Sequence, residues 1–303
     1  MPDGDRVIRA GAEVRLVSFS TDGGTLAGAC RDSKVRIWDA RSGALQRTVD
    51  WNPDDRRSLA LPPGARLFAA AGPDKVIQVW DLRNGELLHR LTGHTELTGT
   101  LAFSADGAML ASSSAAERDV RLWDLPSAKQ RFVLADGVGG AASLAFSPKG
   151  DLLAGSNYDT NLRVWSTRTG ELLRTIEDLP VSMFALVFSP DGAYLASAGV
   201  DQTIYLWDTK HWTVRRRLTG QGQMISCMAF SRDGSLLATG GSDSNSNRNP
   251  TKVIFWDTAS GAVLRQVAAA HTVSSLAVAP DGGSVAVADG QDSVQIWKAR
   301  AGR

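Results

Sequence analysis

The stretch that decides the fold is residues 186–208, which read LVFSPDGAYLASAGVDQTIYLWD. Residues 189–192 (SPDG) place Pro at the second and Gly at the fourth position of a turn, which suits a type I reversal between antiparallel strands. Residues 195–198 (LASA) are small or aliphatic and predict the strand after this turn. Aliphatic residues alternate before Trp207, which predicts a further strand with one face in an apolar layer. The stretch is therefore typical of three successive antiparallel strands.

The same pattern recurs along the chain. Its tryptophan appears seven times, at spacings between 41 and 49 residues, as Trp38, Trp80, Trp123, Trp165, Trp207, Trp256 and Trp297. An apolar residue closes the first strand of each repeat, at Phe19, Leu61, Phe103, Phe146, Phe188, Phe230 and Val278. A weaker fourth strand follows a Thr-Gly or Ser-Gly turn, as in residues 169–174. Each repeat of about 42 residues therefore predicts four antiparallel strands.

With these repeats in register, the chain resembles the WD-repeat family of β-propellers over nearly its whole length. The resemblance implies an all-β protein with one domain, residues 1–303, made of seven four-stranded antiparallel blades. The expected blades cover approximately residues 12–50, 51–92, 93–135, 136–178, 179–219, 220–268 and 269–298. The last repeat has only three strands, so we expect residues 6–10 (RVIRA) to supply its fourth strand and close the ring.

Composition excludes several classes of partner. The 33 Lys and Arg residues balance 32 Asp and Glu residues, so the chain lacks the basic excess typical of binding to nucleic acids or anionic membranes. Cys30 and Cys227 both lie in apolar runs, which favours reduced, buried thiols. The chain contains no run of about 18 apolar residues. We expect a cytoplasmic protein, monomeric by itself and able to join a larger complex, without nucleic acid, membrane or cofactor.

The resemblance also implies polar residues with a structural role. In this family an Asp in the turn between the second and third strands joins a His, a Ser or Thr, and the Trp in a buried tetrad. Thirteen residues after the end of the first strand, such an Asp occurs in five repeats, at Asp32, Asp74, Asp159, Asp201 and Asp243. Most repeats lack the His, so we expect the complete tetrad to be rare.

The third repeat is the one that carries the tetrad His. There His94, Ser112 and Trp123 are present, and an inserted residue leaves Glu117 or Asp119 as the acid. We expect His94 to be a hydrogen-bonded strut in a buried network rather than a general base. An amide version is expected in the sixth repeat, from Gln221, Thr239, Asp243 and Trp256.

No arrangement of reactive residues predicts an enzyme. The sequence contains no His-Glu-x-x-His, Cys-x-x-Cys, Gly-x-Ser-x-Gly or Gly-x-x-x-x-Gly-Lys motif. Residues 137–142 (GVGGAA) match a relaxed dinucleotide fingerprint but precede a strand, and residues 243–250 (DSNSNRNP) resemble a calcium loop without its Gly and final Glu. We therefore expect no catalytic site, no bound metal and no cofactor.

Members of the family bind peptides and proteins chiefly on the narrower end of the ring, which the resemblance allows us to place here. The positions are four and six residues before the end of the first strand, and one before the turn Asp. They are charged in the first two repeats and apolar in later ones: Glu13, Arg15, Arg31, Asp55, Arg57, Leu97, Tyr158, Phe184 and Met224. Trp51 is expected beside the Arg side of this ring. Aromatic residues, Met and Arg are enriched in interface cores, so we expect a partner-binding face.

The predicted function is therefore a non-catalytic scaffold that binds partner proteins or peptides. An alternative is a substrate receptor of a ubiquitin ligase, because residues 38–41 (WDAR) and 80–83 (WDLR) match the Trp-Asp-x-Arg pattern of adaptor-binding members. An enzyme with a site in the central channel is the least favoured class, since acids and histidines do not cluster there. The basic run at residues 215–217 is expected on an outer strand.

Overall fold

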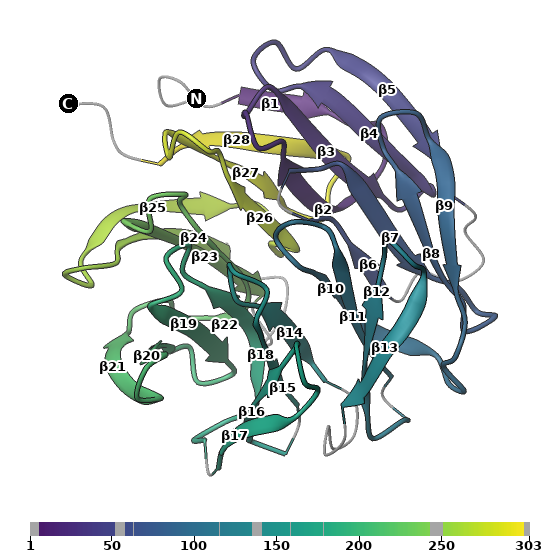
Figure 1. The fold of residues 1–303 in the computed structure, drawn as a ribbon. Helices are drawn as coiled ribbons and strands as arrows, with labels where there is room; N and C mark the ends of the chain where they lie inside the picture. The colour runs from purple at the N-terminus through teal and green to yellow at the C-terminus, as the bar shows by residue number, and fades with distance from the viewer. Residues whose placement is uncertain are drawn as a thin grey trace.

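The computed structural model describes residues 6–51, 58–62, 64–114, 116–134, 141–157, 159–177, 179–242 and 251–299. These residues form seven four-stranded antiparallel sheets arranged in a ring (Figure 1). The first three blades contain β2 (Val14–Phe19), β3 (Thr25–Cys30), β4 (Lys34–Asp39), β5 (Leu45–Asp50); β6 (Ser58–Ala60), β7 (Leu67–Ala71), β8 (Ile77–Asp81), β9 (Glu86–Leu91); and β10 (Thr98–Phe103), β11 (Met109–Ser114), β12 (Val120–Asp124), β13 (Lys129–Leu134).

The remaining blades follow the same order from the innermost to the outermost strand. Blades 4 and 5 contain β14 (Ser143–Phe146), β15 (Leu152–Ser156), β16 (Leu162–Ser166), β17 (Leu172–Ile176); and β18 (Met183–Phe188), β19 (Tyr194–Gly199), β20 (Ile204–Asp208), β21 (Thr213–Leu218). Blades 6 and 7 contain β22 (Met224–Phe230), β23 (Leu236–Ser242), β24 (Thr251–Asp257), β25 (Val263–Ala269); and β26 (Ser275–Val278), β27 (Ser284–Ala288), β28 (Ser293–Lys298), with β1 (Arg6–Arg9).

Burial changes from the second to the fourth strand of a blade. In β19 every residue after Tyr194 is buried, because small and aliphatic side chains fit between the blades on either side. In the outermost strand of the same blade, β21, only Leu218 is buried. The hydrophobic core is therefore divided into clusters between neighbouring blades, such as the one that joins Ala27 of β3 to Phe68 of β7.

The ring closes as the sequence predicts. β1 pairs antiparallel with β28, with Arg6 opposite Ile296, so the last blade takes its fourth strand from the start of the chain. Figure 1 shows the purple β1 beside the yellow β28. The connection after β1 is fixed to the same blade, because the backbone N–H groups of Ala10 and Val14 donate to the carbonyls of Asp292 (2.7 Å) and Gln291 (2.9 Å). Closure thus removes an open sheet edge.

A contact between neighbouring blades has no counterpart in the sequence predictions. On five outer strands an Arg stands opposite the residue that precedes the core Trp, and three of these side chains bond to the next blade: Arg6, Arg216 and Arg265. Arg216 donates to the backbone carbonyls of Ala259 and Ser260 in the next blade, both at 2.7 Å. Arg6 donates likewise to Ala40 and Arg41, and Arg265 to Lys298. These side chains satisfy turn carbonyls and connect successive blades.

Candidate protein-interaction face

We define the narrow face as the end of the ring that carries the loops into the innermost strands and the turns between second and third strands. Four innermost strands have a β-bulge where they reach this face, and the extra residue of the bulge is Arg15, Gly99, Phe184 or Ser226. A bulge bends a strand and re-aims its side chain. The bulged residues are those placed four positions before the end of the first strand, and two of them, Arg15 and Phe184, belong to the set predicted from the sequence.

Glycines on the second strand leave room for two of these bulges. A Cβ on Gly199 would overlap the backbone carbonyl of Ser182, and one on Gly241 would overlap that of Met224. Neither glycine has a positive φ, so close approach of the backbone is the reason for Gly here. For these two bulges the glycine is a signal that can be read in the sequence, but the bulges themselves were not predicted.

The charged part of the narrow face is an ion-pair cluster in blade 1. Arg31 Nη1 lies 2.7 Å from Glu13 Oε2, and Arg15 Nε lies 3.6 Å from Glu13 Oε1. The Arg31 side chain is 55% exposed, which leaves much of its guanidinium accessible. Asp55 and Arg57, also predicted for this part, lie outside the described residues. The structure therefore brings together three of the predicted charged residues.

The apolar part lies on later blades. Leu97, Phe184 and Met224 are each partly exposed, on blades 3, 5 and 6. Val200, which precedes the turn acid of blade 5, is 48% exposed and was missed by the sequence analysis. Its position, one residue before Asp201, follows the same rule that selected Arg31. Tyr158 lies outside the described residues.

Trp51 does not stand on this face as an exposed ring. It is 4% exposed and packs in the cluster between blades 1 and 2, with its ring centroid 5.3 Å from that of Phe68. The prediction placed it beside the arginines because it lies in the loop, residues 50–55, that leads to the second blade. Burial instead gives Trp51 the packing role of a core aromatic.

His94 belongs to a buried chain of hydrogen bonds in blade 3. Trp123 Nε1 donates to Ser112 Oγ at 2.7 Å, and this hydroxyl lies 2.7 Å from His94 Nε2. His94 Nδ1 contacts Glu117, which also accepts from the Thr95 hydroxyl at 2.6 Å. Because the indole donates to the hydroxyl, the hydroxyl donates to Nε2, and Nδ1–H donates to the carboxylate. The structure thus selects Glu117 as the acid.

Electrostatics support this assignment of protons. Burial lowers the pKa of His94 more than the neighbouring Glu117 raises it, so the imidazole is neutral at pH 7. Burial raises the pKa of Glu117, but hydrogen bonds from Thr95 and His94 outweigh it and bring the pKa to about 2. Asp119, the other candidate acid, instead lies 3.7 Å from Arg121 Nη2.

The turn acids of other blades have local partners in place of a His. Three of them pair with the residue four positions later on the third strand: Asp32 with Arg36 (2.9 Å), Asp159 with Arg163 (2.6 Å) and Asp201 with the hydroxyl of Tyr205 (2.7 Å). Asp74 instead accepts from Arg90 on the outer strand at 3.1 Å. Asp243 lies outside the described residues. This second pattern, acid followed by Arg or Tyr four residues later, was readable in the sequence.

In blade 6 the predicted amide network forms among the described residues, and its predicted acid, Asp243, lies outside them. Trp256 Nε1 donates to Thr239 Oγ1 at 2.9 Å, and this hydroxyl donates to Gln221 Oε1 at 2.7 Å. Gln221 Nε2 then donates to the backbone carbonyl of Lys252 at 3.0 Å. A carbonyl thus ends the chain of donors where Glu117 ends it in blade 3.

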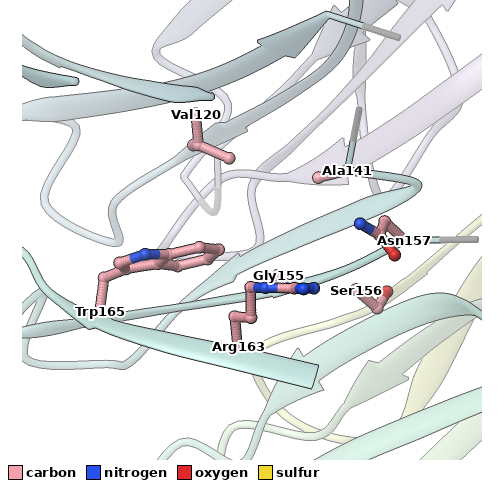
Figure 2. A pocket seen from close by; sticks show the side chains of 7 residues that line it. All are labelled: Val120, Ala141, Gly155, Ser156, Asn157, Arg163 and Trp165. Carbon is pink, nitrogen blue, oxygen red and sulfur yellow. The ribbon is translucent and has the colours of Figure 1, made fainter. Parts of the chain in front are cut away.

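Blade 4 has Gly155 at the position of Ser112. The ring of Trp165 lies against this glycine, and a Cβ there would be 2.9 Å from Cζ3 of the indole. Figure 2 shows Trp165, Arg163 and Asn157 around a cavity of about 10 Å³, bounded by Val120 on the neighbouring blade. That volume holds about one water molecule, which is too small for a substrate.

Neither a metal site nor a membrane segment is found in the described part of the chain. Among those residues no group of three or more His, Cys, Asp and Glu side chains is placed to hold a metal ion. The same residues include no helix long and apolar enough to cross a membrane.

Seven four-stranded blades, closed by strands from both ends of the chain, define a seven-bladed β-propeller of the WD-repeat type. The model of the family described as IFT122 first beta-propeller matches residues 13–298. The chain belongs to this family. No curated protein matches the sequence.

Proposed function

We propose that the protein is a non-catalytic interaction module that binds partner proteins or peptides on its narrow face. The observation that carries the proposal is the set of β-bulges, which turn Arg15 and Phe184 out of the regular strand alternation at this end of the ring. A propeller of the IFT122 type suggests a scaffold that acts within a larger complex.

The chemistry of the face favours an extended segment with two kinds of side chain. Phe184, Val200 and Met224 offer partly exposed apolar surface in blades 5 and 6. Arg31 in blade 1 offers a guanidinium whose present partner is Glu13. An acidic or phosphorylated group of the partner would compete with Glu13 for Arg31 and gain bidentate hydrogen bonds.

The experiment is a comparison of two variants against a partner captured by pull-down with the purified ring. Phe184→Ala should weaken binding by about 2 kcal/mol or more with little salt dependence, since buried aromatic anchors dominate affinity. Arg31→Ala should have a smaller effect that shrinks as salt is raised. Leu173→Ala, on an outer strand with 43% exposure, is the matched control and should bind like the parent.

Binding that survives in the Phe184→Ala/Arg31→Ala double variant, with an unchanged melting temperature, would reject the narrow face as the binding site.

We further propose that the protein acts in the cytoplasm, is monomeric by itself, and needs no cofactor, nucleic acid or membrane. Its nearly neutral charge supports the last two points, the lack of a nucleic-acid partner and of binding to an anionic membrane.

The alternative, a ubiquitin-ligase substrate receptor, rests on the two Trp-Asp-x-Arg patterns. In the second pattern Arg83 Nη2 lies 2.6 Å from Asp81 Oδ2, within the same turn. This local ion pair gives the Arg a structural role without an adaptor. We therefore prefer the scaffold function.

A further inference from the structure

A shallow depression of about 290 Å³ lies on the outside of blade 3, at the turn between β12 and β13. Five residues line it: Asp124, Ser127, Lys129, Gln130 and Arg131. This turn is at the opposite end of β12 from the turn that carries Glu117, so the depression is separate from the narrow face. A partner could therefore contact both surfaces independently.

The cations of the depression are available and its acid is already satisfied. Lys129 and Arg131 are exposed, and within the described part of the chain neither forms an ion pair with an acid. Asp124 accepts from the backbone N–H of Ser127 at 3.0 Å and from the Ser127 hydroxyl. These bonds, together with a smaller effect of the nearby charge of Arg131, lower the pKa of Asp124 and keep it ionised. One satisfied carboxylate beside two cations leaves an excess of one positive charge.

The donors are held in place by their neighbours. Arg121 Nη1 donates to Gln130 Oε1 at 2.7 Å, which orients the amide so that its Nε2 remains a donor. Arg121 is held in turn by Glu117, 3.5 Å from its Nε. The guanidinium of Arg131 lies 5.6 Å from the ring centroid of Phe132. The buried network of blade 3 thus extends to this surface.

A β-bulge in β13 also helps to orient Arg131. Gln130 stands opposite Trp123 and Phe132 opposite Leu122, so Arg131 is the bulged residue of the outer strand. Phe132 anchors the strand against Gly170 of blade 4, where a Cβ would lie 2.9 Å from its ring. Arg131 therefore projects from a strand that is fixed on both sides.

From this geometry we propose that the depression binds a carboxylate of an acidic segment in a partner protein, through Lys129, Arg131 and Gln130 Nε2. Charge complementarity selects an anion, and Asp124 on its rim selects a singly charged carboxylate over a phosphate dianion, which it repels more strongly. The inference uses residues outside the narrow face, so it can fail or succeed apart from the proposed function.

The test measures fluorescence anisotropy of a fluorescein-labelled hexaglutamate peptide with the whole protein at about 50 mM salt, where surface charges are weakly screened. The parent should bind saturably, and Lys129→Ala/Arg131→Ala should bind about tenfold more weakly. The matched control is Arg215→Ala, because Arg215 is the bulged residue of the outer strand in blade 5 and lies in a denser basic run. This control should bind like the parent.

Three results would overturn the proposal. They are no saturable binding by the parent, equal binding by the double variant, and an equal loss in Arg215→Ala, which would indicate unspecific attraction. A peptide with one phosphoserine that binds more tightly than hexaglutamate, and loses this advantage in Lys129→Ala/Arg131→Ala, would replace the carboxylate by a phosphoryl group. Melting temperatures monitor folding, and Phe184→Ala should leave hexaglutamate binding unchanged.

Discussion

Blades 3 and 4 are neighbours with the same strand register, yet they hold their central tryptophans differently. In blade 3 the indole N–H begins a hydrogen-bonded chain that passes through Ser112 and His94. In blade 4 Gly155 takes the place of Ser112, and the ring of Trp165 packs directly against the backbone. The turn acid of blade 4, Asp159, accepts a hydrogen bond from Arg163. The residue at this position of the repeat can thus hold the core Trp in place either through a hydrogen bond or by leaving room for close packing.

The largest effect should come from removing either ring. Trp123→Ala and Trp165→Ala should each reduce the free energy of unfolding by about 3 to 5 kcal/mol, as expected for a large buried aromatic. Trp123→Ala should be the more damaging, because Ser112 loses its donor. Chemical denaturation measures both. Trp212→Ala, a partly buried control off the repeat period, should cost less, and equal costs for all three would contradict the repeat register.

Alanine in place of Ser112 in blade 3, or of Gly155 in blade 4, should destabilise the protein, in the first case by removing a hydrogen-bonding group and in the second by adding a methyl group. Ser112→Ala leaves the indole N–H of Trp123 and Nε2 of His94 without their hydrogen-bond partner, at a cost of about 2 kcal/mol or more. Gly155→Ala inserts a methyl group against Trp165 and should cost about 1 to 3 kcal/mol by overpacking. In a Trp165→Phe background the second cost should fall. If it does not, the indole is not what excludes a side chain at Gly155.

Blade 3 is the one blade whose tetrad should make the stability of the protein depend on pH. The pKa of Glu117 is about 2 in the folded protein, so its stabilisation is complete above the ordinary pKa of 4.5 and is lost as pH falls toward 2. The lowered pKa of His94 acts in the same direction below pH 6.5, because the unfolded chain binds the proton more readily. Glu117→Gln should cost about 1 to 2 kcal/mol at pH 7.

The difference in stability between Glu117→Gln and the parent should become smaller at pH 3. Thermal unfolding monitored by circular dichroism measures this difference. Ser197→Ala in blade 5, which lacks a tetrad His, serves as the control and should show a pH-independent loss. A constant difference between Glu117→Gln and the parent from pH 3 to pH 7 would show that the carboxylate contributes no charge-dependent stability.

The smallest effect concerns the turn of blade 4. Thr160 has a φ of 59°, a left-handed conformation that β-branched residues adopt only with strain. Thr160→Gly should therefore raise stability by roughly 0.5 to 1 kcal/mol, while Thr160→Ala should gain less. An improvement of equal size in both variants would place its origin in the Thr side chain rather than in the backbone.

The fold was predictable because its signal repeats. Trp207 and the turn at residues 189–192 recur in register, and each copy removes ambiguity that a single short strand would leave. The closing strand followed from the missing fourth strand of the last repeat. Local propensity and spacing were sufficient for these features, and the structure confirms them.

The site was predictable only as a set of positions. Arg31 and Phe184 were selected by their place in the repeat, which does not reveal burial or partners. Trp51 was placed beside the arginines because it lies in the loop that leads to blade 2, but its packing against Phe68 depends on the path of that loop between two blades. Val200 was missed although the same rule reaches it. The contacts of Arg216 with the next blade depend on spacing between blades, which no pattern within one repeat encodes.

The pairing of β1 with β28 also determines when the ring can complete its folding. Within the ring, β1 is synthesised before every other strand, and its partner β28 is synthesised after them. Nearly the whole chain must then be closed into a loop before Arg6 can face Ile296, and such non-local pairings form slowly. Until then β1 and the unfinished last blade each expose an edge that another chain could occupy. A nascent propeller is therefore most vulnerable to exchange of strands just before its last step.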